Sequence, residues 1–173
     1  TGEKNARLRL EHGSHQKEYL FWKVRNLQQF FQGKPKYLER IHPITGRTYK
    51  YWRYQSQSGP FLGKLQKIFY RDGRKIIPED IGKFLTPRSI AVWYMDDGYY
   101  YSRDKCSYIY LGNVEKMEAE RVTQALDQKF GLKTRVLAKK KGFAIYFPPR
   151  EVIKFKSLIQ EYILDQFKYK LPS

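Results

Sequence analysis

The chain has 173 residues and a formal net charge of +17, because 34 lysine and arginine residues are set against 17 acidic ones. This length can bury a core, and an aromatic content of 17% excludes a disordered basic arm. No long apolar run is present, so we expect a polyanion such as nucleic acid as the partner rather than a membrane. The single cysteine, Cys106, cannot form an internal disulfide, which indicates a reducing, intracellular compartment.

The first part of the chain predicts a strand, a helix, a hairpin and a second helix. Alternating polar and apolar residues indicate a strand over residues 7–11, and an apolar stripe of helical period indicates a helix over 15–31. Residues 36–41 and 48–55 read as two strands joined by a turn-rich loop, followed by a helix over 59–71.

A buried helix is predicted in the middle of the chain. Thr86 can cap its first turn, residues 90–95 are apolar on every side, and Gly98 is suited to a left-handed stop. Asp96 and Asp97 therefore end an apolar helix, where a carboxylate needs a positive partner or a metal ion. The alternative is a plain Asp-Gly turn with both acids in solvent.

The elements of the first part return in the same order after this helix. A strand is predicted over residues 107–111, a helix over 114–130, strands over 133–139 and 143–147, and a helix over 150–164. Each part then ends with a lysine shortly before a proline. The order predicts an internal repeat.

The repeat predicts an α+β protein of two similar halves. Residues 1–83 form the first half-repeat, and residues 84–173 form the second, which begins with the helix over 86–98. No such helix precedes the first half. Either the duplication is asymmetric or, as we favour, an equivalent helix belongs upstream of Thr1.

The segment Ile90-Ala-Val-Trp-Tyr-Met-Asp-Asp-Gly98 resembles the LAGLIDADG motif. The flanking Phe84-Leu-Thr-Pro87 and the terminal Tyr169-Lys-Leu-Pro172 are also similar to segments of the two-motif, intron-encoded LAGLIDADG homing endonucleases, and the resemblance covers essentially the whole chain. It implies two pseudo-symmetric halves, each with a curved antiparallel sheet and helices, forming a saddle over DNA. It also implies Mg²⁺-dependent, site-specific cleavage of double-stranded DNA by a monomer with an internal pseudo-twofold axis.

The resemblance assigns three catalytic positions. Asp97 corresponds to the acid that holds the divalent metal, and Lys75 and Lys170 correspond to the paired lysines near the cleavage centre. The first motif, which supplies a second acid in this family, is absent. The chain therefore carries half an active site, so it is expected to be inactive alone or to take the second acid from another chain.

The predicted hairpins are candidates for base recognition, because a two-stranded ribbon fits the major groove of DNA. For any single basic residue, simple neutralisation of a phosphate is the alternative. Tyrosines at 99–101, 108 and 110 could stack on bases, but packing within a sheet is the favoured interpretation. The candidate DNA-binding residues are Arg7, Arg9, Arg40, Arg47, Lys50, Arg53, Gln55, Gln57, Lys133, Arg135, Lys139 and Lys141.

Two other functions fit the same fold. An RNA-binding splicing maturase needs the basic sheets but not Asp97, and a DNA-binding protein without nuclease activity agrees with the missing first motif. Replacement of Asp97 by asparagine distinguishes cleavage from binding alone.

Overall fold

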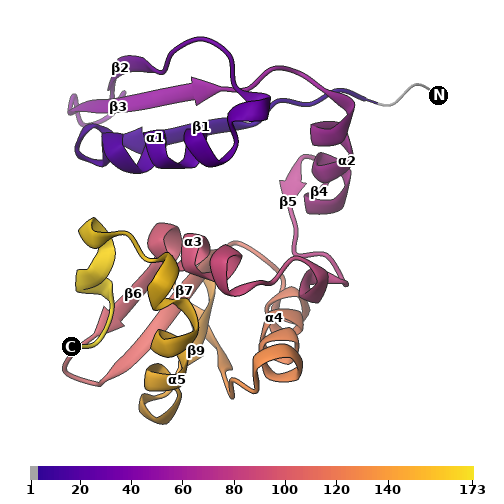
Figure 1. Cartoon of the computed structure of the whole chain (residues 1–173), viewed down its shortest axis with the longest axis vertical. Helices are drawn as coiled ribbons and strands as arrows, with labels where there is room; N and C mark the ends of the chain where they lie inside the picture. Colours follow the sequence, from indigo (N-terminus) through magenta and orange to yellow (C-terminus); the bar gives the residue numbers. More distant parts are fainter. Residues whose placement is uncertain (1–3) are drawn as a thin grey trace. The chain divides into compact units, whose positions relative to one another are not determined.

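The computed structural model describes residues 4–173, and the chain divides into two compact units, Thr1–Ile68 and Phe69–Ser173 (Figure 1). Each unit contains an antiparallel sheet with helices packed against it, which confirms the predicted α+β class. Within residues 4–173, no helix is long and apolar enough to cross a membrane. The predicted boundary between the two half-repeats, at residues 83 and 84, is defined by internal sequence similarity and stays a prediction.

The first unit is built on a three-stranded antiparallel sheet of order β1-β3-β2. Strands β2 and β3 have the predicted bounds, and β1 lies two residues further along than predicted. The elements of this unit are β1 (Arg9–Gly13), η1 (Ser14–Gln16), α1 (Lys17–Asn26), η2 (Gln28–Phe30), β2 (Lys36–Ile41), β3 (Thr48–Gln55) and α2 (Pro60–Phe69), whose last residue belongs to the second unit.

Helix α1 lies along one face of this sheet and forms its core (Figure 1). Leu20, Phe31 and Tyr54 are buried together, and Leu8 and Leu10 pack against them. The inward direction predicted for both leucines is therefore confirmed. Because side chains alternate along a strand, every second residue of the three strands faces away from α1.

Helix α1 ends at Asn26, five residues before the predicted end at Phe31. The Nδ2 atom of Asn26 donates a hydrogen bond of 2.8 Å to the carbonyl oxygen of Trp22, and the chain then continues as the short helix η2. Phe31 is still buried after this break. The apolar stripe thus predicted which residues reach the core but not where the helix ends, since the local hydrogen bond of Asn26 competes with the helix.

The second unit is built on a four-stranded antiparallel sheet of order β6-β7-β9-β8. Its first strand, β6, was not predicted. The elements are β4 (Tyr70–Arg71), β5 (Arg74–Lys75), η3 (Ile81–Lys83), α3 (Pro87–Asp97), β6 (Gly98–Tyr101), β7 (Cys106–Gly112), α4 (Lys116–Phe130), β8 (Arg135–Lys139), β9 (Gly142–Phe147), α5 (Pro149–Ile159), η4 (Gln160–Tyr162) and η5 (Asp165–Lys170).

Helices α3 and α5 pack on this sheet, and α4 contacts its β8 and β9 strands (Figure 1). The rings of Phe147 and Phe155 stack with centroids 4.0 Å apart, and the ring of Tyr94 meets Phe155 edge-on at 5.1 Å. Ile109 and Ile145 are fully buried beside them. This core fixes α3, because Tyr94 lies in its last turn.

Helix α3 begins as predicted, with the Thr86 side chain accepting a hydrogen bond of 3.1 Å from the amide of Ser89. The prediction that it is buried on every side is wrong, because Val92 and Trp93 are only partly buried.

Gly98 does not adopt the predicted left-handed conformation. Its φ of −90° and ψ of 156° are extended, and the chain passes directly into β6. A Cβ atom at this position would lie 2.0 Å from Cδ2 of Tyr94. Glycine is thus required here because the ring of Tyr94 packs against the backbone, and not because of a special backbone angle.

Candidate functional site

The carboxylates of Asp96 and Asp97 are exposed at the C-terminal end of α3. Carboxylate oxygens are the ligands that Mg²⁺ prefers, and this ion is commonly held by one or two carboxylates together with water and substrate phosphate. Among residues 4–173, no group of three or more His, Cys, Asp or Glu side chains lies together as a metal site would require. The helix end therefore fits a metal site only in part, with phosphate, water or another carboxylate completing it.

Lys170 lies beside this helix end. Its Nζ atom donates a hydrogen bond of 2.7 Å to the carbonyl oxygen of Met95, and its own carbonyl oxygen accepts one of 2.6 Å from the hydroxyl of Tyr94. Burial lowers the pKa of the Lys170 amine, and the charges of Asp96 and Asp97 oppose this shift. The structure thus brings together two of the three predicted catalytic residues, Asp97 and Lys170.

Lys75 lies on the short ribbon of β4 and β5, where it pairs with Tyr70 and is exposed. The segment that follows Lys75 is anchored by Glu118, a buried carboxylate on α4. Glu118 accepts hydrogen bonds from the amide of Ile77 at 3.2 Å and from Nη1 of Arg74 at 3.3 Å. This anchor was not predicted, because a glutamate within a helix gives no sequence signal of burial.

The solvent face of the first sheet, which we call the arginine face, gathers several predicted DNA-binding residues. The strand register places these side chains opposite the face covered by α1. The arginine face consists of Arg9, Glu11, Lys36, Leu38, Arg40, Tyr49, Tyr51, Arg53 and Gln55.

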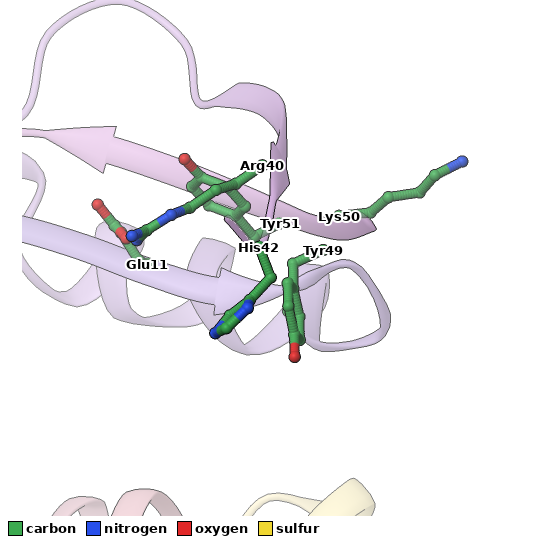
Figure 2. A pocket seen from close by; sticks show the side chains of 7 residues that line it. Glu11, Arg40, His42, Tyr49, Lys50 and Tyr51 are labelled. Carbon is green, nitrogen blue, oxygen red and sulfur yellow. The ribbon is translucent and has the colours of Figure 1, made fainter. Parts of the chain in front are cut away.

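Arg53 is held in place at the centre of this face. Its Nε atom donates a hydrogen bond of 2.7 Å to Glu11, and its Nη2 atom donates one of 3.3 Å to the hydroxyl of Tyr51. These residues lie next to a shallow hollow of about 360 Å³, lined by Glu11, Gly13, Arg40, His42, Tyr49, Lys50 and Tyr51 (Figure 2). A guanidinium fixed in this way is suited to the planar edge of a base.

The side chains of the remaining candidates of the first unit are not on the arginine face. Lys50 is adjacent to Tyr49 and Tyr51 along β3, so its side chain points to the other face of the sheet, where it forms an ion pair with Glu39 at 3.4 Å. Figure 2 shows this side chain extending away from the hollow. Gln57 donates a hydrogen bond of 2.6 Å to Gln32. Arg47 belongs to the loop between β2 and β3, and Arg7 precedes β1. Their roles in DNA binding stay predictions.

In the second unit, Arg135 and Lys139 lie on the solvent face of the sheet, and Lys141 lies in the turn between β8 and β9. Lys133 instead pairs with Asp127 of α4 at 2.8 Å.

This solvent face is mainly aromatic. We call it the tyrosine face; it consists of Tyr99, Tyr101, Tyr108, Tyr110 and Tyr146. The sequence shows tyrosines two residues apart in two segments, but only the strand register reveals that they share one surface and that Tyr146 joins them.

Comparisons with known proteins agree with this architecture. The sequence profile of the LAGLIDADG DNA endonuclease family matches residues 1–155. The chain is 29% identical over 161 residues to "Probable intron-encoded endonuclease 1" of Wickerhamomyces canadensis, covering 90% of this chain and 69% of that protein. It is 27% identical over 176 residues to "Cytochrome b mRNA maturase bI2" of Debaryomyces hansenii, covering 98% of this chain and 65% of that protein.

A solved structure is also similar over nearly the whole chain. It is described as the homing endonuclease I-WcaI bound to its DNA recognition sequence. The TM-score is 0.87 at 29% identity, and the match covers 96% of this chain and 75% of that one. The likeness extends through both units.

Proposed function

The chain belongs to the LAGLIDADG DNA endonuclease family, and we propose that it binds a long, specific site in double-stranded DNA and hydrolyses phosphodiester bonds with the help of Mg²⁺. The observation that carries this proposal is the meeting of Asp97 and Lys170 at the end of α3. The basic and aromatic solvent faces of the two sheets supply the surfaces for recognition.

We propose that Asp97 is the metal ligand. Its position follows from the rigid end of α3, which Tyr94 fixes through its ring contact with Phe155 and its hydroxyl bond to Lys170. When bound, divalent ions compensate charge on the phosphate and make water a better nucleophile.

The two lysines have separate roles in this proposal. The ammonium group of Lys170 can stabilise charge that develops on the phosphate and can donate a proton to the leaving oxygen. Lys75 can contribute a second positive charge, and Glu118 positions the segment on which it lies.

The second carboxylate of a complete site is proposed to come from outside residues 1–173, either from a further segment or from a second chain. The mass of the protein–DNA complex distinguishes these cases, since a second chain gives two copies per duplex.

The experiment that tests the proposal begins with selection of bound sites from a random duplex library. Selected sites are then incubated with Mg²⁺ and the complete protein, which includes the segment or second chain that supplies the second carboxylate. We expect cleavage at one position in each site. Asp97→Asn should abolish cleavage and leave binding nearly unchanged, whereas Asp104→Asn, in the exposed turn between β6 and β7, should leave both unchanged. If the folded, DNA-bound protein cuts no selected site, its role is DNA binding alone, and unchanged cutting by the Asp97 variant removes Asp97 from the mechanism.

The likeness to a maturase supports RNA binding as a second candidate function. Maturase bI2 is named for cytochrome b mRNA, and the match extends over 98% of this chain. Filter binding with intron RNA and with duplex DNA of the same length compares the two functions. Tighter binding of the intron RNA would favour the maturase role.

A further inference from the structure

The tyrosine face is a continuous surface that spans three strands. Tyr99 of β6 pairs with Tyr108 of β7, and Tyr108 pairs in turn with Tyr146 of β9. Tyr101 and Tyr110 extend the surface along their strands. Ser107 and Ile109 alternate with these tyrosines along β7, so they point to the other face of the sheet, where they are buried. The aromatic side chains therefore cover the side of the sheet that the helices leave open.

The rings hold one another in fixed positions. The centroids of Tyr99 and Tyr101 are 4.6 Å apart with planes at 66°, and those of Tyr101 and Tyr108 are 5.3 Å apart with planes at 80°. The hydroxyls of Tyr101 and Tyr110 lie within hydrogen-bond distance at 3.3 Å. A ligand would meet a surface that is already ordered, so little side-chain freedom is lost on binding.

The rings pack against one another edge-to-face or, for Tyr108 and Tyr110, stacked with centroids 6.1 Å apart. In each edge-to-face pair the edge of one ring covers the face of the other, and Nζ of Lys139 lies 4.1 Å from the centroid of Tyr108. Tyr99 and Tyr101 are nevertheless 48% and 40% exposed. A ligand therefore reaches the rings of Tyr99 and Tyr101 most easily.

Two basic residues, Arg135 and Lys139, lie beside the tyrosines on this face. The apolar ring atoms of the tyrosines match the one apolar group in the major groove, the 5-methyl group of thymine.

We propose that the tyrosine face reads thymine 5-methyl groups in the major groove, so that the part of the DNA site bound by the second sheet is rich in A·T pairs. This inference rests on the proposed function, because it takes duplex DNA as the ligand. The inference adds to the proposed function a base preference for one part of the DNA site, and it names the tyrosines that determine this preference.

The experiment uses sites selected from a random duplex library with the full chain. The same selection with Tyr101→Ser identifies the base positions whose preference depends on the tyrosine face. We expect these positions to be thymine in the wild-type selection and unselective in the variant. Tyr101→Phe keeps the ring and should keep the preference for thymine. The control Tyr162→Ser, on η4, should alter neither the selected bases nor the affinity for duplex DNA.

A second measurement needs no variant. Each selected thymine is replaced by deoxyuridine, which lacks only the methyl group. Wild-type protein should bind each such duplex about fourfold more weakly, the value for one buried methyl group. The loss should disappear in the Tyr101→Ser protein, whose fold is checked by circular dichroism.

The possible failures are distinguishable. Failure to bind any duplex overturns the proposed function itself. Binding of duplex DNA without a thymine preference at these positions, or without an effect of deoxyuridine, overturns only the present inference. Loss of preference in Tyr101→Phe would show that the hydroxyl reads the base instead, and tighter, tyrosine-dependent binding of a single strand would show stacking. Either result overturns the assignment to methyl groups.

Discussion

The two sheets of this protein have helices on one face and leave the other open, yet their open faces differ in chemistry. The arginine face of the first unit carries charged side chains with one acid, Glu11, holding Arg53. The tyrosine face of the second unit carries five phenols, with Arg135 and Lys139 among them. The open face of the first sheet is therefore richer in charged hydrogen-bond donors, and that of the second sheet is richer in aromatic contact surface.

The cores of the two units also differ. Among residues 4–68, the buried apolar side chains are Tyr19, Leu20, Phe31, Tyr54 and Leu62, whereas residues 69–173 bury many more. The second unit carries the end of α3, where we propose a metal-binding carboxylate whose position must be exact to within fractions of an ångström. A denser core around Tyr94 and Phe155 provides that rigidity.

Phe155→Ala is expected to have the largest effect, because it removes a fully buried ring that contacts Tyr94 and Phe147. It should lower the free energy of unfolding by about 3–5 kcal/mol. Hydrogen exchange should accelerate in the second unit, while Leu20→Ala should accelerate exchange in the first. Equal acceleration throughout the chain in both variants would show that the units unfold as one body and would remove the contrast between their cores.

Gly98→Ala should destabilise the second unit by about 1–3 kcal/mol, as overpacking does, because the added methyl group would meet the ring of Tyr94. Gly59→Ala is the matched control in the first unit, since a methyl group added there would have no atom beyond its chain neighbours within 4 Å. Urea denaturation measures both. Equal stability of the two variants would contradict the close contact between Tyr94 and the backbone.

Arg53→Gln tests the arginine face. Because Glu11 and Tyr51 fix the guanidinium for a base edge, the change should weaken duplex binding by about 1–3 kcal/mol and relax the preference for guanine at one position. Lys67→Gln removes the same charge from the exposed surface of α2. Binding measured at several salt concentrations separates the contribution of a base contact from that of phosphate neutralisation. A uniform loss across sequences with a smaller salt dependence would mean that Arg53 contacts a phosphate.

The smallest effect concerns alkaline pH. Tyr94, Tyr108 and Tyr110 have pKa values raised to about 12, mainly by burial. Their contribution to stability is fully present below the ordinary value of about 10 and is lost as the pH rises through about 12. The free energy of unfolding should fall in this range, and tyrosinate absorbance should show a late-titrating fraction. Tyr110→Phe should reduce that fraction, and an unchanged titration would contradict the shift at this residue.

Much of the fold was predictable because its signals are local. Turn residues between two alternating segments gave the bounds of β2 and β3, and α4 ends at Phe130 as predicted, followed by Gly131 in a left-handed conformation. The stripe of α5 predicted the buried Val152, Phe155 and Ile159. For the candidate site, the resemblance of the α3 motif predicted Asp97, and the lysine before the terminal proline predicted Lys170; their catalytic roles stay predictions.

The sequence by itself determined the order of the longer elements, the inward side of the amphipathic helices and the residue types available for chemistry, since these follow from periodicity and composition. Only the tertiary structure decided that five tyrosines share one surface, that Met95 holds Lys170, and that Tyr94 makes glycine necessary at position 98. The physical reason is that each of these features depends on strand register or on contact between residues far apart in the chain, and neither leaves a local pattern.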